Sequence, residues 1–383
     1  MSEITGGELF ARALQNEGIE ILFGLPSPEI DPLFAELEAH GVRLVPIRHE
    51  AAGVHMAEGL YKTTGKVAAV LGNPGPGSAN LVPGVLTALH EGVPVLAITS
   101  QHRLGVVYPS SPATFQGQDQ LDLFQPCVKW GGPIFEWARI PEVLRMAFRR
   151  MFDGRPGPVH IELPAPILYE TGDETRAPIF APSASRGSAP QPSEGQLDEA
   201  AEMLAAAKHP VVIAGTGVDR ADARAAALEI AEALSCPAMP TMAGRASVPS
   251  DHSNYVSGFS PGGDAARAEA DVLLVAGSRI GNLDVPYDKY WGDPAGQLLI
   301  QIDIDPANLG VTRPLALGIV ADARPALEGI AERLRQMTLP ARDGADLARY
   351  RELDMQAKLE QAAPILDWQG PGIHPAPAVG AIG

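Results

Sequence analysis

Short apolar runs alternate with amphipathic segments over residues 1–170 of the chain. Short runs with β-branched residues and flanking turn residues predict buried strands, and the amphipathic segments between them predict helices. Strands that alternate with helices are typical of βαβ units around a parallel sheet. We therefore expect a first α/β domain with strands in the segments IEILFGLP, VRLVPI, KVAAVLG, PVLAITS and GPVHIELP.

The alternation stops at residues 171–192 and then resumes. This stretch is rich in Pro, Ser, Ala and charge, with little apolar periodicity, which predicts a linker. Residues 193–335 predict a second, Rossmann-like parallel-sheet α/β domain with strands in PVVIAGTG, PAMPT, VLLVAGS and LLIQIDID. In the remaining segment, 336–383, we expect one charged helix near residues 343–362.

Composition narrows the kinds of ligand that we expect. The formal net charge is −17 and no cluster of Lys and Arg is present, which disfavours nucleic acid and anionic membranes. The two cysteines, Cys127 and Cys236, are too few for a disulfide framework or a zinc site. No apolar stretch is long enough to span a bilayer, and no signal-peptide pattern is visible. We expect a soluble, cytoplasmic protein that binds small molecules.

A charged triplet, Arg48-His49-Glu50, lies where the run VRLVPI meets a helical pattern. Ligands of open α/β sheets bind beyond the carboxyl ends of the strands, so Glu50 is a candidate functional residue. The alternative is that Glu50 only complements the dipole of its helix, which contributes ~0.3 to 1 kcal/mol.

A loop rich in Gly and Pro follows the run KVAAVLG. In NPGPGSAN, Gly75 and Gly77 flank Pro76. Glycines let the backbone approach a ligand closely and prolines hold the loop rigid, although a tight turn alone would explain the same pattern. The loop lacks the lysine of a P-loop and the spacing of GxGxxG, so it does not predict a phosphate or dinucleotide site.

Four segments of the first block resemble the pyrimidine-binding domain of thiamine-diphosphate-dependent enzymes. They are FGLPSPEIDPLFAEL, IRHEAAGVHMAEGLYKTTGK, GNPGPGSANLVPGVLTALHEGVPVLAITSQ and DGRPGPVHIELPAPI, in the order of the family and at matching intervals. Residues 193–335 resemble the central domain of the same family, so the resemblance covers nearly the whole chain. The branch that it indicates comprises acetolactate synthases, 2-hydroxyacyl-CoA lyases and benzoylformate decarboxylases.

The resemblance implies that Glu50 activates the cofactor. The matching glutamate of the family hydrogen-bonds N1′ of the aminopyrimidine and favours the imino tautomer, which removes the thiazolium C2 proton and gives the ylide. Sharing a proton with a weakly basic ring nitrogen calls for dry, mostly apolar surroundings. Glu50 is therefore predicted to be both a catalytic and a cofactor-binding residue.

The resemblance assigns roles to further residues of the same motifs. Gly24 and Pro26 in FGLP, and Asn73, Pro76 and Asn80 in NPGPGSAN, are expected to bind the cofactor near its pyrimidine. The segment FGLPS departs from the family, in which a glycine often follows this proline. The backbone conformation of this loop is therefore not predicted.

Substrate-binding residues are expected in a separate segment. Phe115 and Gln116 resemble a pair that faces the substrate in acetolactate synthases, so Gln116 is also a catalytic candidate. Lys129 matches a lysine that attracts an anionic substrate. Exposed Gln and Lys are usually only solvated, which is the alternative for both. No metal ligand is predicted, because the dispersed histidines have no metal-ligand spacing.

The second block has no complete dinucleotide fingerprint. AGTGVDR carries two glycines after a strand but lacks the third, which disfavours a nicotinamide cofactor. Some relatives hold FAD or an ADP-containing nucleotide against this domain, and residues 277–284 are where such a group would bind. FAD, ADP and a purely structural role all stay open.

The third domain of the family, which binds the diphosphate through Mg²⁺, is missing from the sequence, because no GDG run has the required surroundings. Truncation, a partner chain that carries the diphosphate-binding domain, and a degenerate non-catalytic relative would each explain this. The stop just inside a helix-like start favours truncation. We expect the chain alone to bind thiamine diphosphate weakly and to be inactive.

The expected function is that of an acetolactate synthase-like carboligase or lyase that uses thiamine diphosphate on 2-oxo acids or 2-hydroxyacyl compounds. The alternatives are a 2-hydroxyacyl-CoA lyase, a 2-oxo acid decarboxylase and, in another class, a non-catalytic subunit or scaffold. Active sites of the family form between subunits, which implies a homodimer or homotetramer. The sequence does not identify the donor and acceptor substrates.

Overall fold

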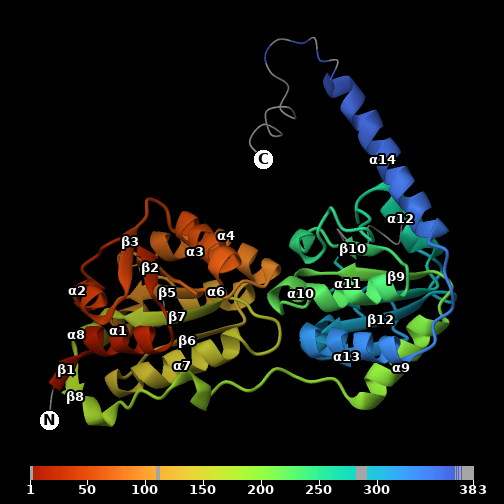
Figure 1. Cartoon of the computed structure of the whole chain (residues 1–383). Coiled ribbons are helices and arrows are strands. Elements are labelled where there is room, and N and C mark those ends of the chain that lie inside the picture. The colour runs from red at the N-terminus through yellow and green to blue at the C-terminus, as the bar shows by residue number, and fades with distance from the viewer. Residues whose placement is uncertain are drawn as a thin grey trace. The chain divides into compact units, whose positions relative to one another are not determined.

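The computed structural model of the chain describes residues 3–108, 113–281, 291–366, 368, 370 and 372. The chain divides into two compact units, Met1–Ser188 and Ala189–Gly383. Each unit is built around a parallel sheet of its own (Figure 1). The predicted fold class, α/β with two parallel-sheet domains, is confirmed.

The strands of the first unit are β1 (Glu3–Thr5), β2 (Ile21–Gly24), β3 (Arg43–Pro46), β4 (Ala69–Gly72), β5 (Leu96–Gln101), β6 (Trp130–Pro133), β7 (Val159–Pro164) and β8 (Thr171–Asp173). Six of them form a sheet in the order β3-β2-β4-β5-β7-β6, and all neighbours are parallel. A separate antiparallel pair joins β1 to β8. The stretch 171–192, predicted as a linker, therefore begins with a paired strand.

The helices of the first unit are α1 (Gly6–Asn16), α2 (Asp31–Leu37), α3 (Glu50–Thr64), α4 (Pro76–Glu91), α5 (Leu104–Val107), α6 (Gln120–Phe124), α7 (Ile140–Met151) and α8 (Ala165–Tyr169). Helices α1, α2 and α7 pack on the face of the sheet that carries Leu22 and Leu71. Helices α3 and α4 pack on the opposite face, against Phe23 and Val70. Because successive side chains alternate between two covered faces, the central strands β4, β5 and β7 are buried on both faces.

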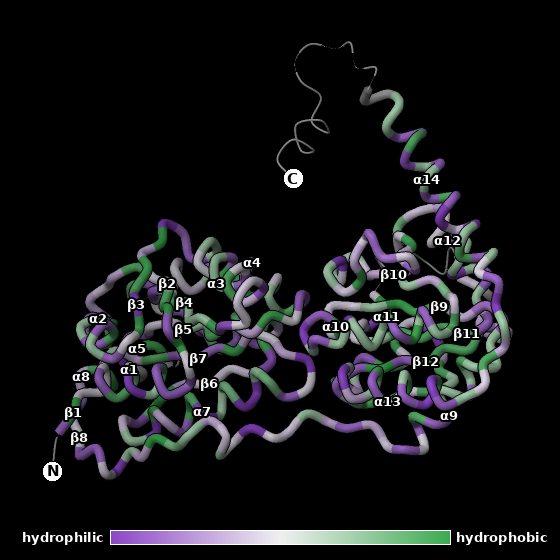
Figure 2. The backbone as a smooth tube through the Cα atoms, in the orientation of Figure 1, coloured by the Kyte–Doolittle hydropathy of each residue, from purple (hydrophilic) through white to green (hydrophobic). Residues whose placement is uncertain are grey.

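The second unit repeats this arrangement with β9 (Pro210–Ala214), β10 (Ala238–Pro240), β11 (Val272–Ala276), β12 (Leu298–Asp303), β13 (Leu317–Val320), α9 (Glu194–Ala206), α10 (Thr216–Arg220), α11 (Arg224–Ala233), α12 (Pro261–Glu269), α13 (Ala323–Gln336) and α14 (Ala345–Leu366). Its parallel sheet has the order β10-β9-β11-β12-β13. Helices α9, α11 and α13 cover one face, and α12 and α14 cover the other. Figure 2 shows the hydrophobic residues gathered on the central strands of each unit.

The direction of winding in the first sheet changes between β2 and β4. Strand β2 leads through α2 to β3 on one side, whereas β4 lies on the other side of β2 and leads to α4. Helices α2 and α4 lie on opposite faces, so the loops after β2 and β4 diverge. Open α/β sheets bind ligands at such a switch point, beyond the carboxyl ends of the strands. The fold therefore directs attention to the residues that follow β2, β3 and β4.

Candidate functional site

Glu50 is the first residue of α3 and is only 7% exposed. The side chain of His49 caps the helix, because its Nδ1 accepts a hydrogen bond from Ala51 N at 3.3 Å. The connection from β3 to α3 turns Glu50 inward and leaves Arg48 and His49 exposed. Since an exposed carboxylate would complement the helix dipole as well, the burial of Glu50 needs another explanation.

Two residues of α4 lie close to the Glu50 carboxylate. Asn80 Nδ2 donates a hydrogen bond to Glu50 Oε2 at 3.0 Å. A methyl group built on Gly77 would lie 3.1 Å from Glu50 Oε1, so a side chain at this position would crowd the carboxylate. Within the described part of the chain, Oε1 itself accepts no hydrogen bond. One oxygen is held by Asn80, and the other is available to a ligand.

The turn between β4 and α4 is tight and closes around Asn73. Gly75 has a φ of +67°, which favours glycine, and Pro76 is the first residue of α4. The backbone N of Ser78 donates to Asn73 O at 2.8 Å, and Ser78 Oγ lies 2.9 Å from the same oxygen. Asn73 Oδ1 is buried, and no described protein group donates to it. A buried acceptor without a donor is costly, so this atom marks a place where a ligand can donate.

Phe115 and Gln116 lie beside the same turn. A methyl group built on Gly75 would lie 2.9 Å from Gln116 O and 3.1 Å from Gln116 Cβ. The side chain of Phe115 is 78% exposed, while its carbonyl oxygen accepts a hydrogen bond from His102 Nε2 at 2.8 Å. The structure thus brings the predicted substrate pair next to the predicted cofactor turn.

Gly24 and Pro26 follow the neighbouring strand. Gly24 ends β2, and a methyl group there would lie 3.2 Å from Leu71 Cβ, so the glycine lets β2 pack closely on β4. Pro26 is exposed in the loop that follows. These residues share the sheet edge with Glu50, but no hydrogen bond between described groups joins either of them to it. Their cofactor-binding role stays a prediction.

Lys129 is not brought together with the other predicted residues. It precedes β6, so it lies at the amino ends of the parallel strands, whereas Glu50 and Asn73 follow the carboxyl ends. Its Nζ donates to the carbonyl oxygens of Asp153 and, at 2.6 Å, Arg155. These contacts hold the connection before β7 in place, and the role of Lys129 in attracting substrate stays a prediction.

Glu162 is a fully buried acid in β7 that the motifs do not include. Gln101 Nε2 and Gln120 Nε2 donate to its Oε2 at 3.2 and 3.1 Å, and the Tyr108 hydroxyl donates to its Oε1 at 3.2 Å. Burial raises the pKa of Glu162, and these hydrogen bonds partly offset that rise. Burial and the charge of Glu162 also raise the pKa of Tyr108. The sequence does contain one signal for Glu162. It is a glutamate inside the buried strand VHIELP, and a buried glutamate needs hydrogen-bond partners.

The two glycines of AGTGVDR in the second unit pack against the backbone of Gly277. A methyl group on Gly215 would lie 2.3 Å from Gly277 O, and one on Gly217 would lie 2.6 Å from Gly277 Cα. The two glycines of AGTGVDR therefore allow two loops to touch. Of the segment 277–284, in which we expected a nucleotide, residues 282–284 lie outside the described residues.

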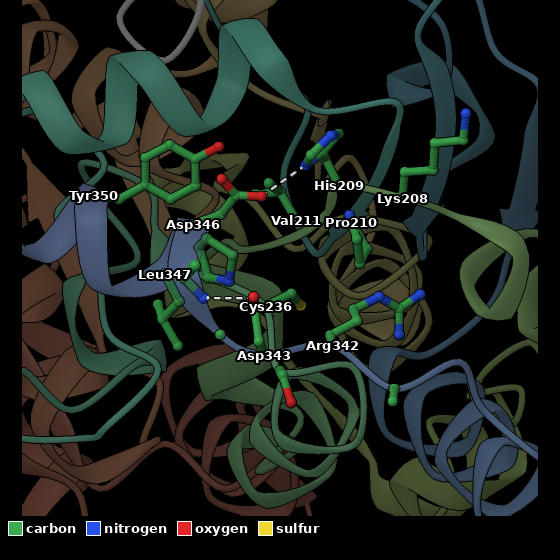
Figure 3. A pocket seen from close by; sticks show the side chains of 15 residues that line it. Lys208, His209, Pro210, Val211, Cys236, Arg342, Asp343, Asp346, Leu347 and Tyr350 are labelled. Carbon is green, nitrogen blue, oxygen red and sulfur yellow. Dashed lines mark hydrogen bonds and ion pairs between the residues drawn. The ribbon is translucent and has the colours of Figure 1, made fainter.

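A pocket of about 280 Å³ in the second unit lies at the amino end of β9, beside the start of α14 (Figure 3). His209 Nδ1 and Asp346 Oδ2 are 2.8 Å apart across it. Arg342 donates to the carbonyl oxygen of Ala207 at 2.7 Å and so caps the end of α9. These contacts fasten α14 to the sheet, and the pocket contains none of the predicted site residues.

Among the residues that the structure describes, no helix combines the length and the apolar character needed to cross a membrane. In the same residues, His, Cys, Asp and Glu form no group of three or more that could hold a metal ion.

Comparison with known proteins gives matches over both units. The family description "thiamine pyrophosphate enzyme, N-terminal TPP binding domain" matches residues 4–123, and "thiamine pyrophosphate enzyme, central domain" matches residues 197–330. Thiamine pyrophosphate is thiamine diphosphate. The two matches correspond to the two domains that the resemblance predicted.

Several known proteins are similar along most of the chain. Glyoxylate carboligase of Escherichia coli is 33% identical over 337 residues, which cover 85% of this chain and 54% of the relative. A probable acetolactate synthase large subunit of Methanococcus aeolicus is 30% identical over 387 residues, or 97% of this chain and 63% of the relative. The large subunit of acetolactate synthase isozyme 3 of Escherichia coli is 31% identical over 346 residues, or 88% and 59%.

The chain therefore spans between 54% and 63% of the length of these relatives. Their names agree with the branch that the sequence motifs indicated. On the two matching domains and these relatives, the chain belongs to the family of thiamine-diphosphate-dependent enzymes.

Proposed function

We propose that this chain supplies the cofactor-activating part of an acetolactate synthase-like carboligase that acts on 2-oxo acids. The observation that carries the proposal is the buried Glu50 carboxylate, which Asn80 holds through one oxygen while the other oxygen is unbonded. The relatives named acetolactate synthase and glyoxylate carboligase support the same class of reaction.

The residues around Glu50 fit an aminopyrimidine. Such a ring carries an amino group that donates hydrogen bonds and a ring nitrogen that can share a proton. Asn73 Oδ1 is a buried acceptor without a donor, and Glu50 Oε1 is a carboxylate oxygen without a partner. Both lie near the same point, because a methyl group on Gly77 would be 3.1 Å from Glu50 Oε1 and 3.3 Å from Asn73 Cβ. We propose that these two residues hold the pyrimidine.

The role of Glu50 in the reaction is to hold and release one proton at Oε1. Asn80 fixes the orientation of the carboxyl group through Oε2, so the proton is presented in one direction. Burial keeps water from competing for it. Bound thiamine diphosphate would supply nucleophilic carbanion chemistry toward the substrate carbonyl. Phe115 and Gln116, beside the Gly75 turn, are placed to contact the substrate.

The remaining parts of the assembly are also proposals. We propose that Mg²⁺ and the diphosphate are held by a diphosphate-binding domain of the kind found in the family, and that the enzyme is a cytoplasmic homodimer or homotetramer. FAD or an ADP-containing nucleotide at the second unit stays a prediction. In that unit the glycines of AGTGVDR pack against Gly277, so they leave no space there for a ligand to approach the backbone.

The test measures cofactor activation directly. Thiamine diphosphate and Mg²⁺ are added to the chain, with and without a partner chain that carries a diphosphate-binding domain, and exchange of the C2 proton for deuterium is followed by NMR. We expect the complete assembly to accelerate exchange and Glu50→Gln to lower the rate by roughly a hundredfold or more, since the loss is that of a positioned acid–base group.

A matched control is Glu17→Gln, which changes another largely buried carboxylate of the same unit, the partner of Arg186 in an ion pair. It should leave the exchange rate unchanged. Cofactor binding without accelerated exchange in the wild-type assembly would favour the non-catalytic alternative, and near wild-type exchange in Glu50→Gln would remove Glu50 from the mechanism.

A further inference from the structure

Glu162 joins segments of the first unit that are far apart in the sequence. Its carboxylate, in β7, accepts hydrogen bonds from Gln101 at the end of β5, from Tyr108, and from Gln120 at the start of α6. The side chains of Glu162, Gln101 and Gln120 are fully buried. All three donors therefore come from the ends or the interior of one segment, 101–120.

The segment 101–120 carries the substrate pair Phe115 and Gln116. Further hydrogen bonds hold the described part of this segment to its own ends. Gln101 Nε2 also donates to Gln118 O at 3.0 Å, and His102 Nε2 lies 2.8 Å from Phe115 O. Gln116, with a φ of +56°, is pressed against the backbone of Gly75. The position of Gln116 thus depends on how the two ends of the segment are anchored.

The same network reaches the cofactor turn. Gln120 Oε1 accepts a hydrogen bond from Ser78 Oγ, and the backbone N of Ser78 donates to Asn73 O at 2.8 Å. A continuous chain of contacts therefore runs from Glu162 through Gln120 and Ser78 to Asn73. This chain of contacts connects the segment that carries Gln116 with the turn that carries Pro76.

Burying a carboxyl group inside a sheet that helices cover on both faces costs free energy. Replacing buried ionic groups by apolar ones is often neutral or stabilising, so packing alone does not account for Glu162. Its donors are long polar side chains that an apolar residue could not orient. Fixing the position of the segment they belong to accounts for both observations.

We propose that Glu162 is a positioning residue for substrate recognition. It anchors the described residues 101–108 and 113–120 so that Gln116 meets the 2-oxo acid beside the activated cofactor. This inference rests on the proposed function and deepens it, because it assigns the selection of substrate to a network separate from Glu50. Glu162 itself does not contact the substrate.

The experiment compares Glu162→Gln and the milder Tyr108→Phe with wild type and with the control Glu17→Gln. Each variant is assembled with thiamine diphosphate, Mg²⁺ and the diphosphate-binding domain, and pyruvate is the probe substrate. The measurements are KM and kcat for pyruvate, the Kd of thiamine diphosphate, and amide hydrogen exchange of a peptide that covers residues 113–120.

We expect Glu162→Gln to raise KM for pyruvate roughly tenfold and Tyr108→Phe to raise it about threefold, as for the loss of hydrogen bonds to a charged group. The Kd of thiamine diphosphate should stay within about twofold, since Glu50 and Asn73 are intact. Exchange in residues 113–120 should accelerate without acceleration in α1 or α7. Glu17→Gln should match wild type in all of these.

Unchanged KM and unchanged exchange in both variants would overturn the inference. So would a loss of cofactor affinity together with faster exchange throughout the unit, because that outcome describes a stabilising core residue. If the wild-type assembly turns over no 2-oxo acid, the proposed function fails. The exchange data then still decide whether Glu162 anchors residues 113–120.

Discussion

Both units place glycine-containing loops at the carboxyl ends of parallel strands, yet the glycines meet different neighbours. In the first unit, Gly77 faces the Glu50 carboxylate, and Asn73 Oδ1 nearby is buried without a donor. In the second unit, Gly215 and Gly217 face the backbone of Gly277. The first arrangement leaves polar atoms for a ligand, whereas the second joins two loops.

The polar side chains at the two sheet edges differ in the same way. In the second unit, Gln301 donates to the carbonyl oxygens of Ser278 and Asn308 and accepts from Gly310 N. Asp303 Oδ1 accepts from Asp305 N and from Asn308 Nδ2. These polar groups form hydrogen bonds with other groups of the same unit. A shared fold therefore does not imply a shared function, and the unsatisfied acceptors distinguish the unit that we propose to bind the pyrimidine.

The comparison predicts a large loss of stability from Gly215→Ala. The new methyl group would lie 2.3 Å from Gly277 O and 2.6 Å from Ser278 Cβ, and backbone at this distance limits relaxation. We expect the second unit to lose about 3 kcal/mol in its free energy of unfolding, measured in urea, while the C2 exchange rate of bound cofactor stays the same. A stable variant that no longer supports exchange would show that this loop is a ligand site.

Gly77→Ala should have the opposite profile. Its methyl group would lie 3.1 Å from Glu50 Oε1, so the carboxyl group must shift by a few tenths of an ångström. We expect C2 exchange to slow roughly tenfold with little change in stability, since small misplacements of catalytic groups are costly. The control is Gly59→Ala in α3, where the new methyl group meets nothing within 4 Å. Equal exchange rates in the two variants would contradict this account of Gly77.

Asn80→Ala removes the donor that holds Glu50 Oε2. We expect the C2 exchange rate to fall about fivefold, because one hydrogen bond to a carboxylate is lost while the proton-carrying group remains. Asn16→Ala is a suitable control, because Asn16 donates only to the exposed carbonyl oxygen of Phe180. A rate unchanged from wild type would mean that packing alone orients Glu50.

A further prediction concerns pH and the buried His160. Burial lowers the pKa of His160 to about 3 from its ordinary value of 6.5. The unfolded chain therefore binds a proton that the folded unit excludes, so the stability is fully present above about pH 6.5 and declines as the pH falls toward about 3. The slope attributable to this one histidine is at most ~1.4 kcal/mol per pH unit.

Glu162 acts in the opposite sense, because its raised pKa favours the folded state below its ordinary pKa and this contribution is lost as pH rises through the raised value. Urea unfolding of wild type and His160→Gln between pH 7 and 4 separates the two residues. As the pH falls, the free energy of unfolding should decrease less steeply in His160→Gln than in wild type. Equal pH slopes in the two proteins would exclude His160 as the source of the acid-induced loss of stability.

Much of the fold follows from the sequence pattern, and the failures have physical causes. The five strands expected in the first block correspond to β2, β3, β4, β5 and β7. Of these, β4, β5 and β7 are buried on both faces, whereas β3 at the sheet edge is partly exposed. Strand β6, with the sequence WGGP, was not predicted because two glycines and a proline carry no strand signal. It lies at the edge of the sheet, where a short, weakly apolar strand is tolerated.

The candidate site residues were named from the sequence for a different reason, and their roles stay predictions. Glu50, Asn73 and Asn80 lie in motifs that resemble a family, so they could be named. The hydrogen bond from Asn80 to Glu50 joins residues 30 positions apart, and only the pairing of α3 with α4 reveals it. Glu162 and Tyr108 carry no motif, and their meeting depends on the register of β5 with β7.

The central claim is that Glu50 shares a proton with the pyrimidine of thiamine diphosphate. A crystal structure of the complete assembly with the cofactor bound tests it most directly. The account predicts a distance of about 2.7 Å between Glu50 Oε1 and N1′ of the ring, with Asn80 still bonded to Oε2. A bound cofactor whose N1′ faces another residue, with Glu50 turned away from the Gly77 turn, would contradict it.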